Sequence, residues 1–188
     1  MRGLWITLVF AALLLTGCGD LSSVLGLANK GNTVFDASLV GAWNSGDAVV
    51  IVQAGPVQNG NDQSYRIDWL GAEGREAPQI VRMEGRLFKI GDQRMLDLTA
   101  SDPGAFAIPC HVFLRVRPVN EGLKVQFVDS KWIRDQVPSS LASFIQDNHP
   151  VLTAPAPQIE AFLLKFGLDE RALDDPILFR RLKQNSRE

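Results

Sequence analysis

The clearest structural signal in the chain is the stretch CHVFLRVRPVNEGLKVQFVDS at residues 110–130. Its two halves are rich in β-branched and aromatic residues, and Asn120-Glu121-Gly122 join them. Two such runs, separated by a few residues that include glycine, are typical of a β-hairpin. We therefore predict two antiparallel strands here, and the segments upstream extend the same pattern.

Four upstream segments also have the residue pattern of strands: DAVVIVQA (47–54), SYRIDWL (64–70), QIVRMEGRLFKIG (79–91) and RMLDLTA (94–100). The third is either two short strands or one strand bent at Gly85. No stretch between them is long enough for the helical crossover that a parallel sheet needs, so the sheet is predicted to be antiparallel. The predicted fold class is mainly β (α+β): an antiparallel meander forming a barrel or strongly curved sheet, with C-terminal helices packed on it.

Helices are expected late in the chain. The segments SKWIRDQV (130–137) and SSLASFIQDN (139–148) predict two short helices interrupted by Pro138. The best helix is PQIEAFLLKFG (157–167), with apolar residues at helical spacing, proline at its start and glycine at its end. The remaining segment, DDPILFRRLKQNSRE, is predicted to contain a short amphipathic turn.

The N-terminus has the layout of a signal peptide. Arg2 is followed by an uncharged apolar stretch from Leu4 to Leu15 and then by the small residues Thr16 and Gly17. A helix needs roughly 20 apolar residues to cross a bilayer core, so this stretch is too short for a permanent transmembrane segment.

The four residues Leu15-Thr16-Gly17-Cys18 resemble the lipobox of bacterial lipoproteins. The resemblance implies cleavage before Cys18 and acylation of this residue, which would attach the protein to a membrane. It also implies the periplasmic face of a bacterial outer membrane, with the inner membrane as the alternative, because Gly19 rather than aspartate follows the cysteine. The predicted organisation is a signal peptide at 1–17, a lipidated tether at 18–37 and a single antiparallel β domain with C-terminal helices at 38–188.

Composition limits the classes of function. The 188 residues contain 19 Lys and Arg against 21 Asp and Glu, and loss of Arg2 with the signal peptide makes the net charge about −3. Nucleic-acid binding demands a basic face, so no nucleic-acid partner is expected. With Cys18 lipidated, Cys110 has no disulfide partner in the chain and is interpreted as a buried thiol.

Gly41-Ala42-Trp43, before the first predicted strand, resembles the Gly-x-Trp motif of lipocalins. This resemblance implies a β-barrel in which Trp43 closes one end. The segments LVGAW, SYRIDWL, GRLFKIG, HVFLRV and VLTAP also resemble a set of bacterial lipoproteins of uncharacterised function, which implies no activity. The later Asp-centred turn motif of lipocalins is not found in the chain.

The residues that could carry catalysis are few. Cys110 and His111 are neighbours on a predicted strand, where successive side chains point to opposite faces, so they cannot form a thiolate–imidazole pair. His149 precedes Pro150 and is interpreted as a loop residue. We therefore predict no catalytic site, no metal site and no cofactor, and a protein that is not an enzyme.

Three tryptophans, Trp43, Trp69 and Trp132, are the candidate ligand-binding residues, with core packing as the alternative interpretation. Two classes of function remain open: a non-enzymatic binding or interaction module of the cell envelope, and a lipocalin-like carrier of an apolar small molecule. The predicted partners are the membrane, through acyl chains on Cys18, and either an envelope protein or an apolar small molecule. A carrier needs an apolar cavity of roughly 300 Å³ or more, whereas an interaction module should have a filled core.

The lipobox resemblance generates the first testable prediction. We expect Cys18→Ala to release the protein from the membrane fraction, because the acyl chains that hold it there can no longer be attached. Cell fractionation followed by immunoblotting measures this, and Cys110→Ala is the matched control that should stay with the membranes. A Cys18→Ala protein that still sediments with membranes contradicts the prediction.

Overall fold

The structure is a computed structural model that describes residues 21–29, 31–58, 62–71, 79–102, 109–146, 149–167 and 169–183. The predicted signal peptide and the predicted lipidation site, Cys18, lie outside the described residues. Within these ranges, no helix combines the length and the apolar character that crossing a membrane requires.

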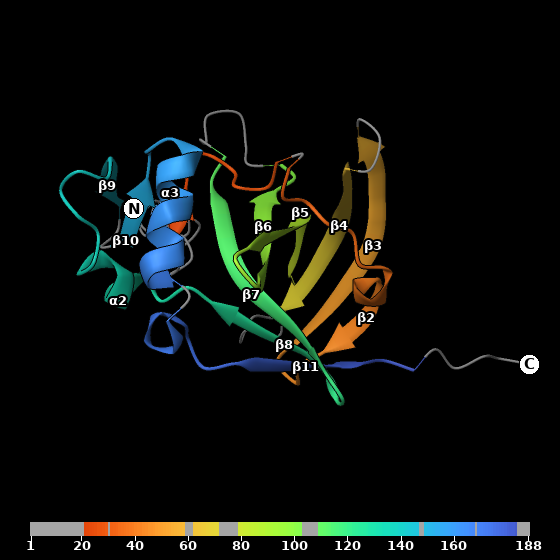
Figure 1. Cartoon of the computed structure of the whole chain (residues 1–188). Helices are drawn as coiled ribbons and strands as arrows, with labels where there is room; N and C mark the ends of the chain where they lie inside the picture. Colours follow the sequence, from red (N-terminus) through yellow and green to blue (C-terminus); the bar gives the residue numbers. More distant parts are fainter. Residues whose placement is uncertain are drawn as a thin grey trace, which may run out of the picture.

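Eight strands close into an antiparallel β-barrel (Figure 1). They are β2 (Gly41–Asn44), β3 (Ala48–Gln58), β4 (Asp62–Gly71), β5 (Gln79–Ile90), β6 (Gln93–Ala100), β7 (His111–Val119), β8 (Gly122–Phe127) and β11 (Ile177–Arg181). Strands β2 to β8 form a meander, and β11 lies between β8 and β2. The predicted fold class is confirmed, with a closed barrel in place of an open curved sheet.

The strand that completes the ring comes from the segment predicted as a short amphipathic turn. In β11, Phe179 lies opposite Leu123 of β8, and Arg181 lies opposite Trp43 of β2. The prediction was wrong because five residues are too few to reveal a period. Two flanking strands with open hydrogen-bonding groups impose the extended conformation.

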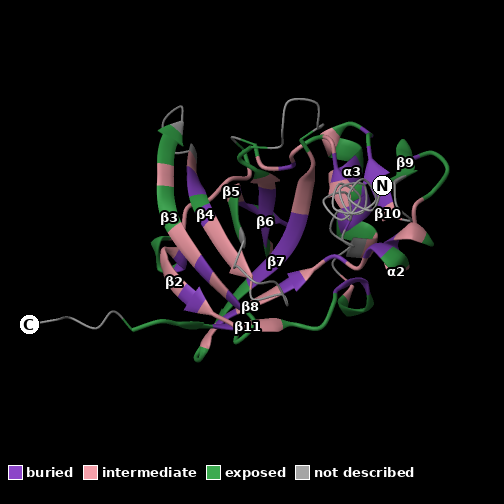
Figure 2. Cartoon of the chain, turned by 180° about the vertical axis from the view of Figure 1, so that it is seen from behind, coloured by how far each residue is buried: buried purple, intermediate pink, exposed green. Residues whose placement is uncertain are grey.

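Alternation along the strands produces two separate cores. Leu87, Leu96 and Leu98 lie in the interior cluster, whereas Phe88 and Met95 belong to a second cluster outside the barrel wall. Successive residues of a strand point to opposite faces, so the same strands serve both cores. Figure 2 shows the resulting long buried stretches on β6 and β7.

Strand β5 is continuous, which decides between the two interpretations of residues 79–91 in favour of one strand. Gly85 is buried within it, and a Cβ atom there would lie 2.8 Å from Ile67 Cδ1 and 3.0 Å from Leu98 Cδ2. The absence of a side chain therefore lets the interior leucine and isoleucine side chains pack directly against this part of the wall.

The outer core is covered by the chain between β8 and β11, beside the barrel in Figure 1. This part contains α2 (Ser130–Arg134), β9 (Ser143–Gln146), β10 (His149–Leu152), α3 (Ala156–Phe162), a π turn (Leu163–Gly167) and the 3₁₀ turn η3 (Glu170–Ala172). The two helices α2 and α3 were predicted. Ile159, Phe162 and Leu163 are buried in the outer core, as their helical spacing predicted.

The predicted helix at 139–148 is wrong. Residues Ser143–Gln146 form β9, which pairs antiparallel with β10. Ser22–Ser23 form a two-residue strand, β1, between β10 and β7, and its pairing with β10 is parallel. This parallel pair is an exception to the antiparallel prediction. It joins two strands that are remote in sequence, Ser22–Ser23 and His149–Leu152, so no local pattern of residues predicts it.

The segment predicted as a tether at 18–37 is part of the fold from Leu21 onward. Leu21 and Leu27 are buried in the outer core. The carboxylate of Asp97, on the outer face of β6, accepts hydrogen bonds from the backbone N–H groups of Leu27 at 2.8 Å and Ala28 at 3.2 Å. Its other oxygen lies 2.6 Å from Nδ1 of His111. The mixed composition of residues 18–37 suggested a flexible spacer. The segment is instead attached to the barrel, because Leu21 and Leu27 pack against its apolar outer surface.

This N-terminal segment continues across the barrel to β2. Val34 donates its backbone N–H to the carbonyl of Leu87 at 2.9 Å, and Lys89 donates to the carbonyl of Asn32 at 3.0 Å. A short 3₁₀ turn, η1 (Ala37–Leu39), then leads into the first barrel strand. The segment 21–40 is called the strap below, because it ties β1, β5 and β2 together.

Asp97 generates a prediction about stability. Asp97→Ala leaves the buried N–H of Leu27 and the partly buried N–H of Ala28 without this acceptor, which should lower the free energy of unfolding by about 3 kcal/mol. Asp97→Asn keeps one acceptor oxygen and should cost about half of that. Urea denaturation of both variants measures the difference, and an alanine variant as stable as the wild type contradicts the proposed attachment of the strap.

Candidate functional site

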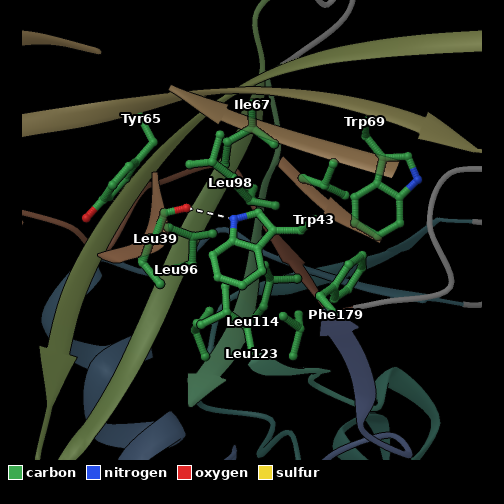
Figure 3. A pocket seen from close by; sticks show the side chains of 14 residues that line it. Leu39, Trp43, Tyr65, Ile67, Trp69, Leu96, Leu98, Leu114, Leu123 and Phe179 are labelled. Carbon is green, nitrogen blue, oxygen red and sulfur yellow. Dashed lines mark hydrogen bonds between the residues drawn. The ribbon is translucent and has the colours of Figure 1, made fainter. Parts of the chain in front are cut away.

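The candidate site is an apolar cavity of about 60 Å³ inside the barrel. Its lining comes from every barrel strand except β5, together with Leu39 of the strap. Figure 3 shows Tyr65 on one side of the group and Trp69 and Phe179 on the other, with Trp43 between them. Only carbon surface faces the empty space, so the cavity can accommodate a small apolar group but offers it no hydrogen bond.

Trp43 is buried on β2, as predicted, and its polar atom is already satisfied. The indole Nε1 donates to the carbonyl of Leu39 at 2.9 Å. The guanidinium of Arg181 stands 4.5 Å above the ring, and its Nη2 donates to the carbonyl of Ser38 at 2.6 Å. These contacts join β2, β11 and the strap, which makes Trp43 a structural element of the barrel.

The three candidate tryptophans do not converge. Trp69 lines the same cavity as Trp43 and meets the ring of Phe179 edge-on, with ring centroids 5.7 Å apart. Trp132 instead packs against the outer core, where the guanidinium of Arg171 lies 5.8 Å from the centre of its ring. A shared ligand site can therefore involve Trp43 and Trp69, but not Trp132.

Tyr65 also lines the cavity, and sequence analysis did not single it out. Its hydroxyl accepts from the backbone N–H of Asp36 at 2.7 Å and donates to the carbonyl of the same residue at 3.2 Å. The ring of Phe35 stacks on it at 5.0 Å. Burial raises the pKa of Tyr65, so the phenol stays protonated and holds the strap over this side of the cavity.

The carboxylate of Asp36 forms part of the same contact. Arg94 Nη1 donates to it at 2.7 Å, and the backbone N–H of Ser38 donates at 2.9 Å. Hydrogen bonds from Ser38, and then the contact with Arg94, hold the pKa of Asp36 below its usual value. Because the folded-state pKa is depressed, the stability that this group contributes is present above the unfolded pKa and is lost as the pH falls through the folded value.

The three residues considered for catalysis lie in separate environments. Cys110 is a half-buried free thiol, and burial raises its pKa, which disfavours the reactive thiolate. His111 contacts Asp97 on the outer face of the barrel. His149, predicted as a loop residue, is the first residue of β10, and its Nδ1 lies 2.8 Å from the hydroxyl of Ser130 at the start of α2.

The contact between Ser130 and His149 was not anticipated from the sequence. Ser130 is 2% exposed, so its hydroxyl is shielded from solvent, and the imidazole holds it against β10. A hydroxyl–imidazole pair is one part of a nucleophilic site, which also needs access for substrate and donors for developing charge. Among the described residues, no group of three or more His, Cys, Asp or Glu side chains is placed to hold a metal ion.

A buried arginine on the outer wall is a further feature that the sequence did not reveal. Arg115 is 2% exposed and forms a bidentate pair with Glu170, at 2.8 and 2.7 Å. It also donates to the side-chain oxygen of Gln126 at 2.6 Å. The hydrogen bonds from Arg115 lower the pKa of Glu170, and this pair attaches η3 to β7 and β8. The Nε of Arg115 is buried and has no hydrogen-bond partner among the described residues.

Comparisons with protein-family models, with curated proteins and with solved structures found no match for this chain.

Trp43 provides the prediction for this site. Trp43→Ala should lower the free energy of unfolding by about 3 to 5 kcal/mol, because it leaves a cavity and removes the bond to Leu39 and the ring beneath Arg181. Trp43→Phe keeps a ring in the interior and should cost less than half as much. Chemical denaturation measures both variants, and an alanine variant within 1 kcal/mol of the wild type, on the order of a surface change, contradicts this assignment.

Proposed function

We propose that the protein is a lipoprotein, acylated at Cys18, whose barrel is a non-enzymatic binding or interaction module on the periplasmic face of the outer membrane. The lipobox resemblance at Leu15-Thr16-Gly17-Cys18 supports the anchor. The observation that supports an interaction module is the filled barrel, whose cavity of about 60 Å³ is a fraction of the roughly 300 Å³ that ligand pockets occupy.

A lipocalin-like carrier of an apolar small molecule is the second candidate. The entirely apolar lining, with two tryptophans and Phe179, favours it, as does the eight-stranded antiparallel barrel. The cavity would have to expand several-fold to enclose a ligand of ordinary size. The side chains that fill it are in contact across the barrel, and such packing resists expansion.

The proposed absence of catalysis rests on the separation of the candidate groups. Burial raises the pKa of Cys110 and so disfavours its thiolate, and the imidazoles of His111 and His149 each make a contact that joins two segments of the fold. A catalytic site needs a nucleophile or base, a group that orients it and a donor for developing charge, within reach of one substrate.

A cavity-filling variant tests the interaction module against the carrier. Val52 lines the cavity, and Val52→Leu adds a methylene there, whereas Val52→Ala enlarges the space. For an interaction module, both variants should restore the envelope phenotype of a deletion strain if they fold. For a carrier, the leucine variant should fail and the alanine variant should succeed.

A second arm of the same complementation assay tests the absence of catalysis. The triple variant Cys110→Ala, His111→Gln and His149→Gln should complement as well as the wild type, while Cys18→Ala should not. Circular dichroism establishes that each variant is folded. A folded triple variant that fails to complement contradicts the non-enzymatic proposal.

A further inference from the structure

The start of the fold lies very close to the proposed anchor. Leu21 is fully buried, and its backbone N–H donates to the carbonyl of Val128 at 3.4 Å. Only Gly19 and Asp20 lie between Cys18 and Leu21 in the sequence, and three residue spacings reach at most about 10 Å. A lipid on Cys18 would thus hold the bilayer surface close to the part of the fold where β1 begins.

The side sheet next to β1 ends in an edge strand that exposes apolar side chains. The strand order is β7, β1, β10 and β9, so β9 is outermost, as Figure 1 shows beside β10. Phe144 and Ile145 of β9 are 43% and 57% exposed. In Figure 2, β9 is among the exposed parts of the surface, at the far side of the molecule from β3.

The register places Phe144 level with Ser22, the first residue of β1. Ser22 pairs with Val151, and Val151 pairs with Phe144, so β9 lies two strand spacings, about 10 Å, beyond β1. This distance equals the reach of the three residues that precede Leu21. Neighbouring side chains of a strand point to opposite faces, so an edge-on approach of the hairpin would bury both Phe144 and Ile145.

We infer that the β9–β10 hairpin is a membrane-docking edge that inserts Phe144 and Ile145 into the interface of the bilayer holding the acyl chains of Cys18. This inference rests on the proposed lipidation. The anchor keeps the hairpin at a high effective concentration near the lipid, so two apolar side chains suffice to orient the barrel. The outer backbone groups of β9 stay in the hydrated headgroup region, because hydrocarbon would leave them without partners.

The orientation has a consequence for the barrel. Docking through β9 turns the strands on the opposite side, including β3, away from the membrane (Figure 1). Val57 of β3 is as exposed as Ile145, at 58%, so it provides a matched control position of the same chemistry.

Site-directed labelling of the full, acylated chain tests the docking edge. Starting from Cys110→Ser, the variants Ile145→Cys and Val57→Cys are labelled with an environment-sensitive fluorophore and reconstituted in vesicles of phosphatidylethanolamine and phosphatidylglycerol. Nitroxide-bearing lipid then serves as the quencher. We expect the label at 145 to lose about half of its fluorescence and the label at 57 to stay nearly unquenched, since nitroxides quench at contact range and interfacial side chains enter only about 5–10 Å.

Mass spectrometry of the same samples separates failure of the docking edge from failure of the proposed anchor. Cys18 without acyl chains overturns the proposed function and the docking edge together. Acylated protein with an unquenched label at 145 overturns the docking edge alone, as does equal quenching at both positions. A third outcome is a fluorophore at 145 that nitroxide lipid does not quench and that becomes less exposed to water as the number of protein molecules per vesicle rises. This outcome shows that a second copy of the protein covers β9, and it also overturns the inference.

Discussion

The pairing of β11 with both β2 and β8 is the interaction on which the rest of the structure depends. It joins residues at opposite ends of the chain, Trp43 and Arg181, and it leaves neither β2 nor β8 with an open edge. The same strand carries Phe179 to the ring of Trp69 and the guanidinium of Arg181 to the ring of Trp43. Without β11 the interior cluster would face solvent through a gap in the wall. Burial of the interior core therefore requires that β11 close the barrel.

A second constraint acts on the outer face of the barrel. Its buried charged side chains, Asp97 and Arg115, need hydrogen-bond partners from the segments that pack over them. Asp97 on β6 is 5% exposed and is satisfied by the strap and by His111. The two Nη atoms of Arg115 on β7 donate to Glu170 and Gln126. Each charge is expensive to desolvate alone and favourable once paired, so it selects the position of the segment that covers it. These polar contacts hold the strap and η3 at defined places on the barrel wall. Apolar contacts alone are not directional and would not specify those places.

The sequence predicted those parts of the fold that have a strong local period. Long strands such as β3 and β5 and the helix α3 show enough alternation or helical spacing to be identified from residues alone. Strands β1, β9 and β11 have five residues or fewer, which is too short to show a period, and the partners of β1 and β11 are remote in sequence, such as Val151 for Ser22. Of the candidate site, Trp43 was found through its motif, whereas Tyr65 and Arg115 were not, because their importance comes from Asp36 and Glu170, which only the folded chain brings near.

Because side chains fill the barrel, its interior has little room for a ligand, and its surface is the larger area open to binding. The interior has about 60 Å³ of apolar space, and its indole and phenol groups are bonded to the strap. The strap runs from Leu21, through β1, to the first barrel strand, so it links the side sheet to the cavity lining at Leu39. The contacts of the strap with Tyr65 and Trp43 therefore fix the position of the barrel interior relative to β1.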